Sequence, residues 1–444
     1  MKIAKQIIKN PSVLATVLIV LGIVFSPGSV DVGGLKTGAT DIASSGKLWR
    51  IATVLLAAAI IFMSLVKRGG LGLLLKGNFS YITIYGLLGI STVAFSQLKM
   101  MTVFKGFEIL VACMIGVAVY MSKDRISSAN TYIRAVFWIY VISVGSALAE
   151  LAVFGTAGHK ELVGETPLLS SMMETSYPPM VGNALGYLGA LVAFFGVYYF
   201  DNAVRNKDSS KLLGSIIFIA GVTVLFLSYT RSVLLFFVLA LMFYFYLEKK
   251  IKRIIVILFL GASIFALPGV HDKVLDHLRR GSTDQQLESM SGRTDFWVNI
   301  FSRNMLNLIV GEGFATGHLF QDYSESSMFG SKIAVVRNAH NSIAEITISS
   351  GFIGVTVWLL LLFRIFRQLL KIRYELKRNK SYDQLLFHHM IMAVFVLSCM
   401  RSLMNNTFVY LTYFYFLLIA LAAYGECYVS DLRRIRAEAN KPVI

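Results

Sequence analysis

Charge is scarce in this chain of 444 residues, because Asp, Glu, Lys and Arg make up 15% of it against about 25% in soluble globular proteins. Only three cysteines occur, and two of them, Cys113 and Cys399, lie in apolar segments, so we expect no disulfide framework and no paired-cysteine metal site. Apolar residues reach 56% of the chain, and mean hydropathy is +0.66. This composition excludes soluble enzymes and disordered tails and is typical of a polytopic membrane protein.

Motifs of soluble enzymes are also missing. The sequence has no GxxxxGK[ST] phosphate-binding loop, no HExxH zinc motif and no Asp-x-Asp pair that could hold a divalent ion on a sugar nucleotide. Gly311-x-Gly313 resembles a dinucleotide loop, but no strand precedes it, so we interpret it as a turn. Ion-driven transport favours charged residues deep in the helices, and the candidates for such positions are few, namely Glu108, Glu150 and Lys105. We therefore expect no metal ion and no cofactor.

Twelve segments approach the roughly 20 apolar residues that cross a bilayer as a helix. They lie near residues 11–27, 48–66, 80–96, 103–122, 131–155, 183–203, 212–230, 233–247, 254–267, 342–363, 384–404 and 407–424. The first segment follows three lysines and mimics a signal peptide, but the many later segments favour an uncleaved first helix. The predicted fold class is an all-α polytopic membrane protein with about twelve transmembrane helices.

Lysine and arginine predict the orientation of these helices. With the N-terminus in the cytoplasm, the inner segments carry 27 Lys and Arg, the short outer connections and helix ends carry 8, and residues 268–339 carry the other 7. Both termini are therefore predicted to be cytoplasmic. The predicted organisation is one integrated membrane domain, with helices one to nine in 1–267, a large periplasmic loop in 268–339, and helices ten to twelve with a basic tail in 340–444.

The 268–339 segment is the only hydrophilic region of the sequence that is large enough to fold by itself. Apolar residues recur in it at helical spacing, namely Phe296, Trp297, Ile300, Phe301, Met305, Leu306 and Ile309. An amphipathic helix with this pattern lies either in the outer headgroup layer or packed on the helix bundle. The pattern does not choose between these two positions.

Two arginines on the predicted outer face have sequence contexts that favour a ligand. Arg231 lies in a Ser-Tyr-Thr-Arg-Ser turn without basic neighbours, and Arg293 lies in Ser-Gly-Arg-Thr-Asp. Each could clamp a phosphate, which the planar guanidinium suits better than Lys. Each also has a structural explanation, since Arg231 could snorkel to lipid phosphates and Arg293 could pair with Asp295. Further basic candidates with weaker context are Arg279, Arg280 and Arg303.

His340 lies where the predicted loop re-enters the membrane. Ser342 and Glu345 have the spacing of a capping box, so we expect helix ten to begin there, with Asn341, Ser342 and Glu345 as supporting residues. Free N–H groups at that helix start would favour anions beside His340 and also its neutral imidazole, the form that a general base needs. A lone histidine at a helix start is more often a surface residue, so its neighbours decide its role.

Together these residues favour one chemistry at the outer face. Arg231 and Arg293 would hold a lipid-linked pyrophosphate and stabilise the charge that grows on this leaving group. His340 would take the proton from an acceptor hydroxyl that attacks the anomeric carbon of the sugar. Attack from the far side would invert the anomeric configuration, and the guanidinium charge would make a divalent ion dispensable.

The same motifs resemble a known family. His-Asn at 340–341, nine residues and Gly-x-x-Gly at 351–354 are similar to the His-Asn-x9-Gly-x-x-Gly signature of the O-antigen ligase and polysaccharide polymerase superfamily. The Tyr-Thr-Arg-Ser turn at Arg231 resembles its first arginine motif. Ser-Gly-Arg-Thr-Asp-Phe-Trp around Arg293, with the Gly-Glu-Gly-Phe that follows, resembles its second. The strong motifs cover residues 228–355, whereas the N-terminal half agrees only in hydropathy.

This resemblance implies an inner-membrane, GT-C-like glycosyltransferase with a periplasmic active site. It implies a donor glycan linked to undecaprenyl pyrophosphate, held by Arg231 and Arg293 without metal, and acceptor activation by His340. The acceptor is the next lipid-linked repeat in an O-antigen or exopolysaccharide polymerase, or the lipid A–core sugar in an O-antigen ligase of lipopolysaccharide biosynthesis. The implied partners are these substrates, membrane lipid, and chain-length regulator or flippase proteins, with no nucleic acid.

A transporter or flippase for lipid-linked oligosaccharide is the alternative, because twelve helices with both termini inside are common there as well. The long late outer loop, the short inner connection at 205–211 and the scarcity of mid-membrane charge argue against it. Within the family, the Gly-Arg-Thr-Asp-Phe-Trp motif leans towards the polymerases.

Overall fold

The computed structural model describes residues 11–25, 45–154, 175–176, 179–180, 182–228, 230–266, 297–298, 300–317 and 339–439. Regular structure in these ranges is helical except for one two-residue ladder, in which Thr175 pairs with Met180 and Ser176 with Pro179. The predicted all-α class is therefore confirmed. Arg279, Arg280 and Arg293 lie outside the described residues.

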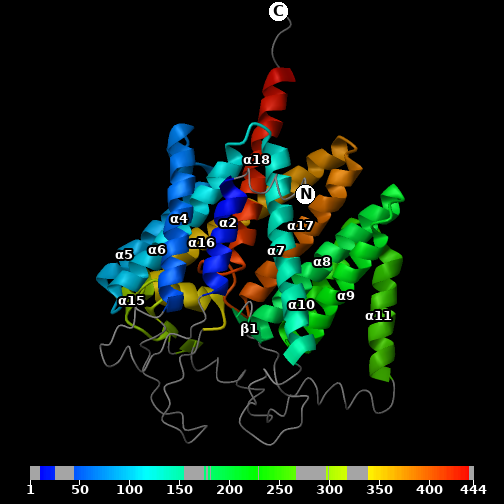
Figure 1. Ribbon diagram of the computed structural model, residues 1–444, viewed down its shortest axis with the longest axis horizontal. Coiled ribbons are helices and arrows are strands. Elements are labelled where there is room, and N and C mark those ends of the chain that lie inside the picture. The colour runs from blue at the N-terminus through cyan, green and yellow to red at the C-terminus, as the bar shows by residue number, and fades with distance from the viewer. Residues whose placement is uncertain are drawn as a thin grey trace, which may run out of the picture. The chain divides into compact units, whose positions relative to one another are not determined.

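The elements follow one another as helices joined mostly by short turns (Figure 1). From the N-terminus to residue 180, the elements are α2 (Pro11–Val24), α4 (Ser45–Lys67), η1 (Leu71–Leu75), α5 (Gly77–Ser91), η2 (Thr92–Ala94), α6 (Lys99–Tyr120), α7 (Arg125–Phe154), β1 (Thr175–Ser176) and β2 (Pro179–Met180). The elements after residue 180 are α8 (Gly182–Asn206), α9 (Lys211–Leu227), α10 (Arg231–Leu247), α11 (Ile251–Ala266), α15 (Met305–Val310), α16 (Ser342–Arg378), α17 (Tyr382–Ser402) and α18 (Tyr415–Ala439).

Each of the twelve predicted apolar segments overlaps one of these helices. Among the described residues, seven helices are long and apolar enough to cross a membrane, namely α4, α6, α7, α8, α16, α17 and α18. The shorter apolar helices include α2, α9 and α10. A membrane protein with several spanning helices follows from these findings, whereas the total of twelve spans stays a prediction.

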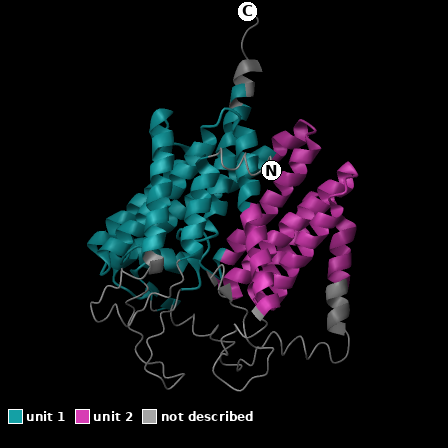
Figure 2. Cartoon of the chain, in the orientation of Figure 1, with its two compact units in different colours: residues 1–136, 296–372, 402–444 teal, residues 137–295, 373–401 magenta. Residues whose placement is uncertain are grey.

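Contacts divide the chain into two compact units (Figure 2). Unit 1 consists of residues 1–136, 296–372 and 402–444, and unit 2 consists of residues 137–295 and 373–401. His340 thus belongs to unit 1 and Arg231 to unit 2. The predicted division of the sequence at residues 267 and 339 concerns membrane topology and stays a prediction.

Helices α8 and α9 of unit 2 lie side by side because glycines remove side chains from their contact (Figure 1). A β-carbon on Gly196 would lie 2.4 Å from the backbone nitrogen of Phe218, and one on Gly189 would lie 2.6 Å from the carbonyl oxygen of Gly221. Small residues let helix backbones approach closely, which matters in lipid because hydrocarbon gives helices no hydrophobic reason to associate. The glycines therefore let the backbones of α8 and α9 pack directly against each other.

The last predicted segment, 407–424, is wrong at its start, because α18 begins only at Tyr415. Residues 403–414 form no helix, and Phe408 has a left-handed φ of 63°. Irregular backbone beside membrane helices persists when its polar groups find partners inside the protein. Three side chains from other helices donate hydrogen bonds to carbonyl oxygens of this segment. Arg50 donates to Leu411 (3.0 Å), Tyr85 to Val409 (3.1 Å) and Trp358 to Phe408 (3.1 Å).

Helix α16 begins at Ser342 as predicted but continues to Arg378, beyond the predicted end at residue 363. Gly351 interrupts it with a φ of 66° at a kink, where a β-carbon would lie within 1.9 Å of the carbonyl oxygen of Ile309. Only glycine fits this position. The first glycine of the Gly-x-x-Gly motif therefore admits the backbone at the end of α15.

Candidate functional site

His340 stands directly before α16 with a left-handed φ of 49°, and its side chain is half-buried. Non-glycine residues seldom adopt this conformation, although histidine, like asparagine and aspartate, tolerates it better than most. Such a conformation costs on the order of 1–3 kcal/mol and persists only where the surroundings hold it. The contacts of the neighbouring residues explain how it is held here.

Both backbone polar groups of Ala339, the residue before His340, are bound by side chains. The indole Nε1 of Trp297 donates to the carbonyl oxygen of Ala339 at 2.8 Å, and the N–H of Ala339 donates to Oε2 of Glu345 at 3.1 Å. Ala339 also belongs to a small hydrophobic core with Ile300, against which Trp297 packs. The chain that enters His340 therefore has a fixed position in unit 1.

Asn341, the residue after His340, closes the start of α16. Its Oδ1 accepts hydrogen bonds from the N–H groups of Ile343 (2.8 Å) and Ala344 (3.2 Å), and its Nδ2 donates to the carbonyl oxygen of Leu403 (3.1 Å). The predicted capping box is therefore wrong in its detail, because Asn341 caps the helix and Ser342 does not. The expectation of free N–H groups beside His340 is wrong for Ile343 and Ala344, whose N–H groups the cap occupies.

Ser342 has a different function from the expected one. Its buried hydroxyl donates to the carbonyl oxygens of Asn405 (3.0 Å) and Thr407 (3.2 Å) and accepts a hydrogen bond from the N–H of Thr407 (2.9 Å). These bonds attach the start of α16 to the irregular 403–414 segment. Ser342 thus connects the start of α16 to residues 405–407 through tertiary contacts rather than by capping the helix.

Glu345 is fully buried and joins the same two regions. Its Oε1 accepts a hydrogen bond from the hydroxyl of Tyr410 at 2.5 Å, and the Tyr410 hydroxyl also contacts that of Ser349. Burial, together with the negative charge of Glu345, raises the pKa of Tyr410 well above its usual range, so the hydroxyl stays a donor. Tyr410 was not predicted, since it lies 65 residues from Glu345 in an apolar stretch without a motif.

The predicted amphipathic helix over 296–309 is not continuous. Residues 302–304 interrupt it, and α15 begins afresh after Asn304, whose side chain accepts from the N–H of Asn307. Ile300 is buried against α16, whereas Met305 is 70% exposed. Arg303, one of the weaker basic candidates, forms an ion pair with Glu312. The first part of this segment therefore packs on the helices, and α15 presents apolar side chains outward.

Arg231 is the first residue of α10 in unit 2. The preceding Thr230 does not cap the helix with its side chain, and its hydroxyl donates to the carbonyl oxygen of Gly182 at 3.0 Å instead. Among the described residues, the buried Nε of Arg231 has no hydrogen-bond partner. An uncapped helix start with a partly buried guanidinium is suited to bind an anion.

Arg401 lies at the same end of unit 2, although its sequence context did not mark it as a site residue. Its guanidinium lies 4.3 Å from the ring centre of Tyr187 and donates to the carbonyl oxygen of Asn183 at 3.5 Å, next to the Gly182 carbonyl that Thr230 contacts. Arg401 is buried, and its contacts with Asn183 and Tyr187 hold the start of α8.

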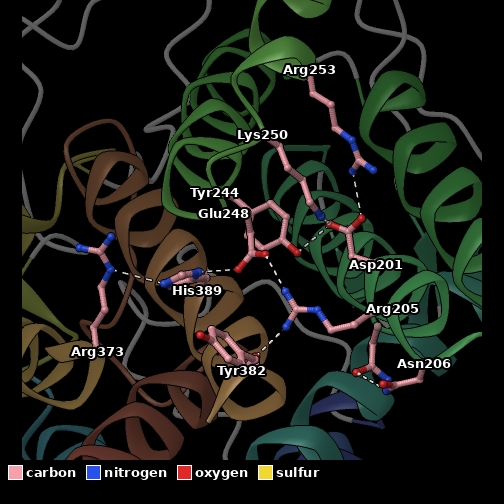
Figure 3. Close-up of polar contacts among 11 residues, drawn as sticks. Asp201, Arg205, Asn206, Tyr244, Glu248, Lys250, Arg253, Arg373, Tyr382 and His389 are labelled. Atoms are coloured by element: carbon pink, nitrogen blue, oxygen red, sulfur yellow. Dashed lines mark hydrogen bonds and ion pairs between the residues drawn. The ribbon is translucent and has the colours of Figure 1, made fainter. Parts of the chain in front are cut away.

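A second polar cluster of unit 2 surrounds Asp201 of α8 (Figure 3). Asp201 accepts hydrogen bonds from Tyr244 (3.0 Å) and Arg253 (2.9 Å) and pairs with Lys250 (2.7 Å). The carboxylate is buried, so these partners offset the cost of removing its charge from water.

Glu248 connects the same cluster to α17 (Figure 3). Its Oε1 lies 2.5 Å from Nδ1 of His389, and its Oε2 lies 3.5 Å from Arg205. Nε of Arg373 donates to Nε2 of His389 at 3.4 Å, which requires a lone pair on that nitrogen. His389 thus lies between Glu248 and Arg373. The charged side chains labelled in Figure 3 each have a partner, which indicates a structural cluster.

The structure thus groups His340, Asn341, Ser342 and Glu345 in unit 1 and places Arg231 in unit 2. Whether Arg231 and Arg293 share a cavity with His340 stays a prediction, since Arg293 lies outside the described residues. In the described part of the chain, no three His, Cys, Asp or Glu side chains form a group that could hold a metal ion.

Residues 216–359 match a protein-family model described as O-antigen ligase. This match includes every predicted site residue, namely Arg231, Arg293, His340, Asn341, Ser342 and Glu345. Neither the curated proteins nor the solved structures gave a match. The resemblance to the O-antigen ligase and polymerase family that the motifs predicted is confirmed for this part of the chain.

Proposed function

We propose that this protein is an inverting glycosyltransferase of the bacterial inner membrane. It transfers a glycan from undecaprenyl pyrophosphate to an acceptor sugar hydroxyl at the periplasmic face, as an O-antigen or exopolysaccharide polymerase or as an O-antigen ligase. The observation that carries the proposal is the match of residues 216–359 to the O-antigen ligase family, because it includes both predicted arginines and His340.

In this proposal His340 is the general base. A base must lie within hydrogen-bond reach of the proton that it removes, so its position matters before its basicity. The bonds from Trp297 and Glu345 hold the peptide groups of Ala339 before it, and the cap by Asn341 holds the chain after it. This support on both sides is what a positioned base requires.

Arg231 and Arg293 bind the pyrophosphate of the donor. At Arg231 the guanidinium is combined with the uncapped start of α10, and both favour negative charge. Their interaction strengthens as the bond between the anomeric carbon and the pyrophosphate oxygen breaks, because charge then accumulates on the leaving group. The arginines therefore carry the charge stabilisation in this reaction.

The reaction balances without a further reagent. The acceptor hydroxyl oxygen forms a bond to the anomeric carbon and loses its proton to His340. The bond to undecaprenyl pyrophosphate breaks with both electrons leaving on the phosphate oxygen. Attack and departure on opposite faces invert the anomeric configuration.

Glycan analysis of a deletion strain tests this function. Loss of a polymerase leaves single repeats on the final acceptor or carrier, and loss of a ligase leaves long glycan on the carrier lipid. Complementation with wild-type protein should restore the normal pattern, whereas Arg231→Ala and His340→Asn should not. Lipid-linked repeats trapped on the cytoplasmic leaflet would indicate a flippase, and full activity of Arg231→Ala would contradict the proposed donor site.

A further inference from the structure

Unit 1 contains a charged cluster that the proposed donor site does not use. Glu108 of α6 has a fully buried side chain and accepts from Nε and Nη2 of Arg50 in α4 at 2.7 and 3.0 Å. Lys105, one turn earlier in α6, lies 3.0 Å from the second carboxylate oxygen. The sequence marked Glu108 and Lys105 as charges inside an apolar segment, and the structure supplies Arg50 as their partner.

This cluster carries one positive charge in excess, because two cations surround one carboxylate. The side chains of Arg50 and Lys105 are only 20% and 16% exposed, so water solvates the excess charge poorly. Asp201 in unit 2 also has two cations, but Arg253 there is 42% exposed and reaches water. The Glu108 cluster therefore has the stronger need for an additional anion.

Hydrogen-bond donors remain for such an anion. Arg50 uses Nε and Nη2 on Glu108 and on the carbonyl oxygen of Leu411, and Nη1 has no hydrogen-bond partner among the described residues. The ammonium group of Lys105 has three donors, and the described part of the chain occupies one of them, through Glu108. A guanidinium and an ammonium together offer the donor set that a phosphate group accepts.

The cluster is connected to the region of His340 by a chain of direct contacts within unit 1. Arg50 holds the carbonyl group of Leu411, and the adjacent Tyr410 donates to Glu345. Glu345 in turn holds the N–H of Ala339, the residue before His340. Arg50 is also near the start of the apolar stretch Leu48–Lys67, the end that the predicted topology places at the outer face, where lipid phosphates lie.

We propose that Arg50 and Lys105 bind the phosphate-bearing headgroup of the acceptor lipid. This inference rests on the proposed function and extends it, because it assigns a second lipid-phosphate site on the side of the general base. The first site, at Arg231, holds the donor. In this arrangement two lipid-linked substrates bind at separate cationic sites, and the acceptor sugar extends from its headgroup towards His340.

Lys105→Met tests the site with little structural cost, because the Arg50–Glu108 pair stays intact. Undecaprenyl pyrophosphate is added to the full-length protein in detergent, and bound copies are counted by native mass spectrometry. We expect two bound molecules in the wild type, with one of them bound about 10- to 100-fold more weakly in Lys105→Met, the effect of losing a charge-assisted hydrogen bond. Lys105→Arg should restore the second molecule.

Lys99→Met is the matched control, because it removes the same charge from the exposed first turn of α6 and should leave both molecules bound. Arg231→Ala should remove the other molecule. The probe stands for the acceptor headgroup because the next lipid-linked repeat of a polymerase carries the same undecaprenyl pyrophosphate. A wild type that binds a single molecule would overturn the inference, and so would a Lys105→Met protein that binds both molecules as the wild type does. Displacement of the second molecule by phosphatidylglycerol or inorganic pyrophosphate at the same concentration as undecaprenyl pyrophosphate would overturn it too. Retained binding in Arg231→Ala with loss in Lys105→Met would contradict the donor site and leave the acceptor site supported.

Discussion

The surroundings of His340 and of Arg231 differ in how much of their bonding capacity the protein itself uses. At His340, the side chains of Trp297 and Glu345 bind the backbone groups of Ala339 before it, and Asn341 after it caps α16. At Arg231, the helix start lacks a side-chain cap, and the buried Nε has no hydrogen-bond partner among the described residues. The protein's own hydrogen bonds hold the backbone on both sides of His340, whereas Arg231 keeps a donor that no described residue uses.

This difference corresponds to two demands of the proposed reaction. A general base must be placed accurately, since small errors in its position lower the rate strongly. A cation that stabilises a leaving group must keep donors directed at the place where charge develops. The firmly held backbone around His340 therefore suits a general base, and the unused hydrogen-bond donor of Arg231 suits an anion-binding group.

The sharpest way to break the comparison is His340→Asn. Asparagine tolerates the left-handed backbone, so the substitution removes the base while the fold is retained. We expect transfer to fall by about 10²- to 10⁴-fold with an unchanged unfolding temperature. Transfer between lipid-linked repeats by purified protein, with thermal unfolding alongside, measures both quantities. Substantial residual transfer would show that His340 is not the base.

Arg231→Ala should have the next largest effect. Removal of a donor directed at developing charge lowers the rate by about 10²- to 10³-fold. Arg231→Lys should recover part of this loss, because the charge returns without the planar guanidinium. Kinetics at varied donor concentration distinguish binding from rate. Equal activity of the Ala and Lys variants would argue against a charge interaction.

Tyr410→Phe should weaken the contacts that hold the backbone around His340, with a smaller effect on transfer. Glu345 then loses a donor in a buried position, which costs about 1–3 kcal/mol of the free energy of unfolding. Transfer should decrease less than in His340→Asn, because the base remains and only its support is changed. Chemical unfolding in detergent measures this cost. The comparison variant is Ser349→Ala, which removes the other hydroxyl that Tyr410 contacts. A Tyr410→Phe protein with wild-type stability and transfer would contradict the supporting role.

The same variant has a predicted pH dependence. The folded-state pKa of Tyr410 is raised by burial and by Glu345, so its stabilising contribution is complete below the ordinary tyrosine pKa of about 10. The contribution is lost as pH rises through the folded-state value. The stability difference between wild type and Tyr410→Phe should therefore be constant from about pH 7 to 9 and shrink above about pH 10. A difference that grows with pH would have the wrong sign.

Tyr244→Phe in the Asp201 cluster should have the smallest effect. Asp201 keeps Lys250 and Arg253, so the loss of one hydrogen bond should cost about 1 kcal/mol of the free energy of unfolding. Transfer activity should not change, because this cluster contacts none of the predicted site residues that the structure describes. A strong loss of transfer without loss of stability would assign the Asp201 cluster to function.

The helical class, the approximate positions of the apolar helices and the family resemblance were all predictable from local patterns. Hydropathy is a property of a short stretch, and the motifs around Arg231, Arg293 and His340 are contiguous in the sequence. The start of α16 at Ser342 was also predicted correctly, because capping signals are local. The choice of Asn341 over Ser342 as the cap was not, since both residue types serve as caps.

Such local patterns could not predict the contacts between segments that are distant in the sequence. Nothing near Tyr410 in the sequence points to Glu345, and nothing near Glu108 points to Arg50. The late start of α18 has the same cause, because residues 407–414 are apolar enough for a helix, yet side chains from other helices bind their carbonyl groups. Hydropathy and motifs act over a few neighbouring residues, whereas burial of a charge or of an irregular backbone is settled by whichever partners the folded chain brings near.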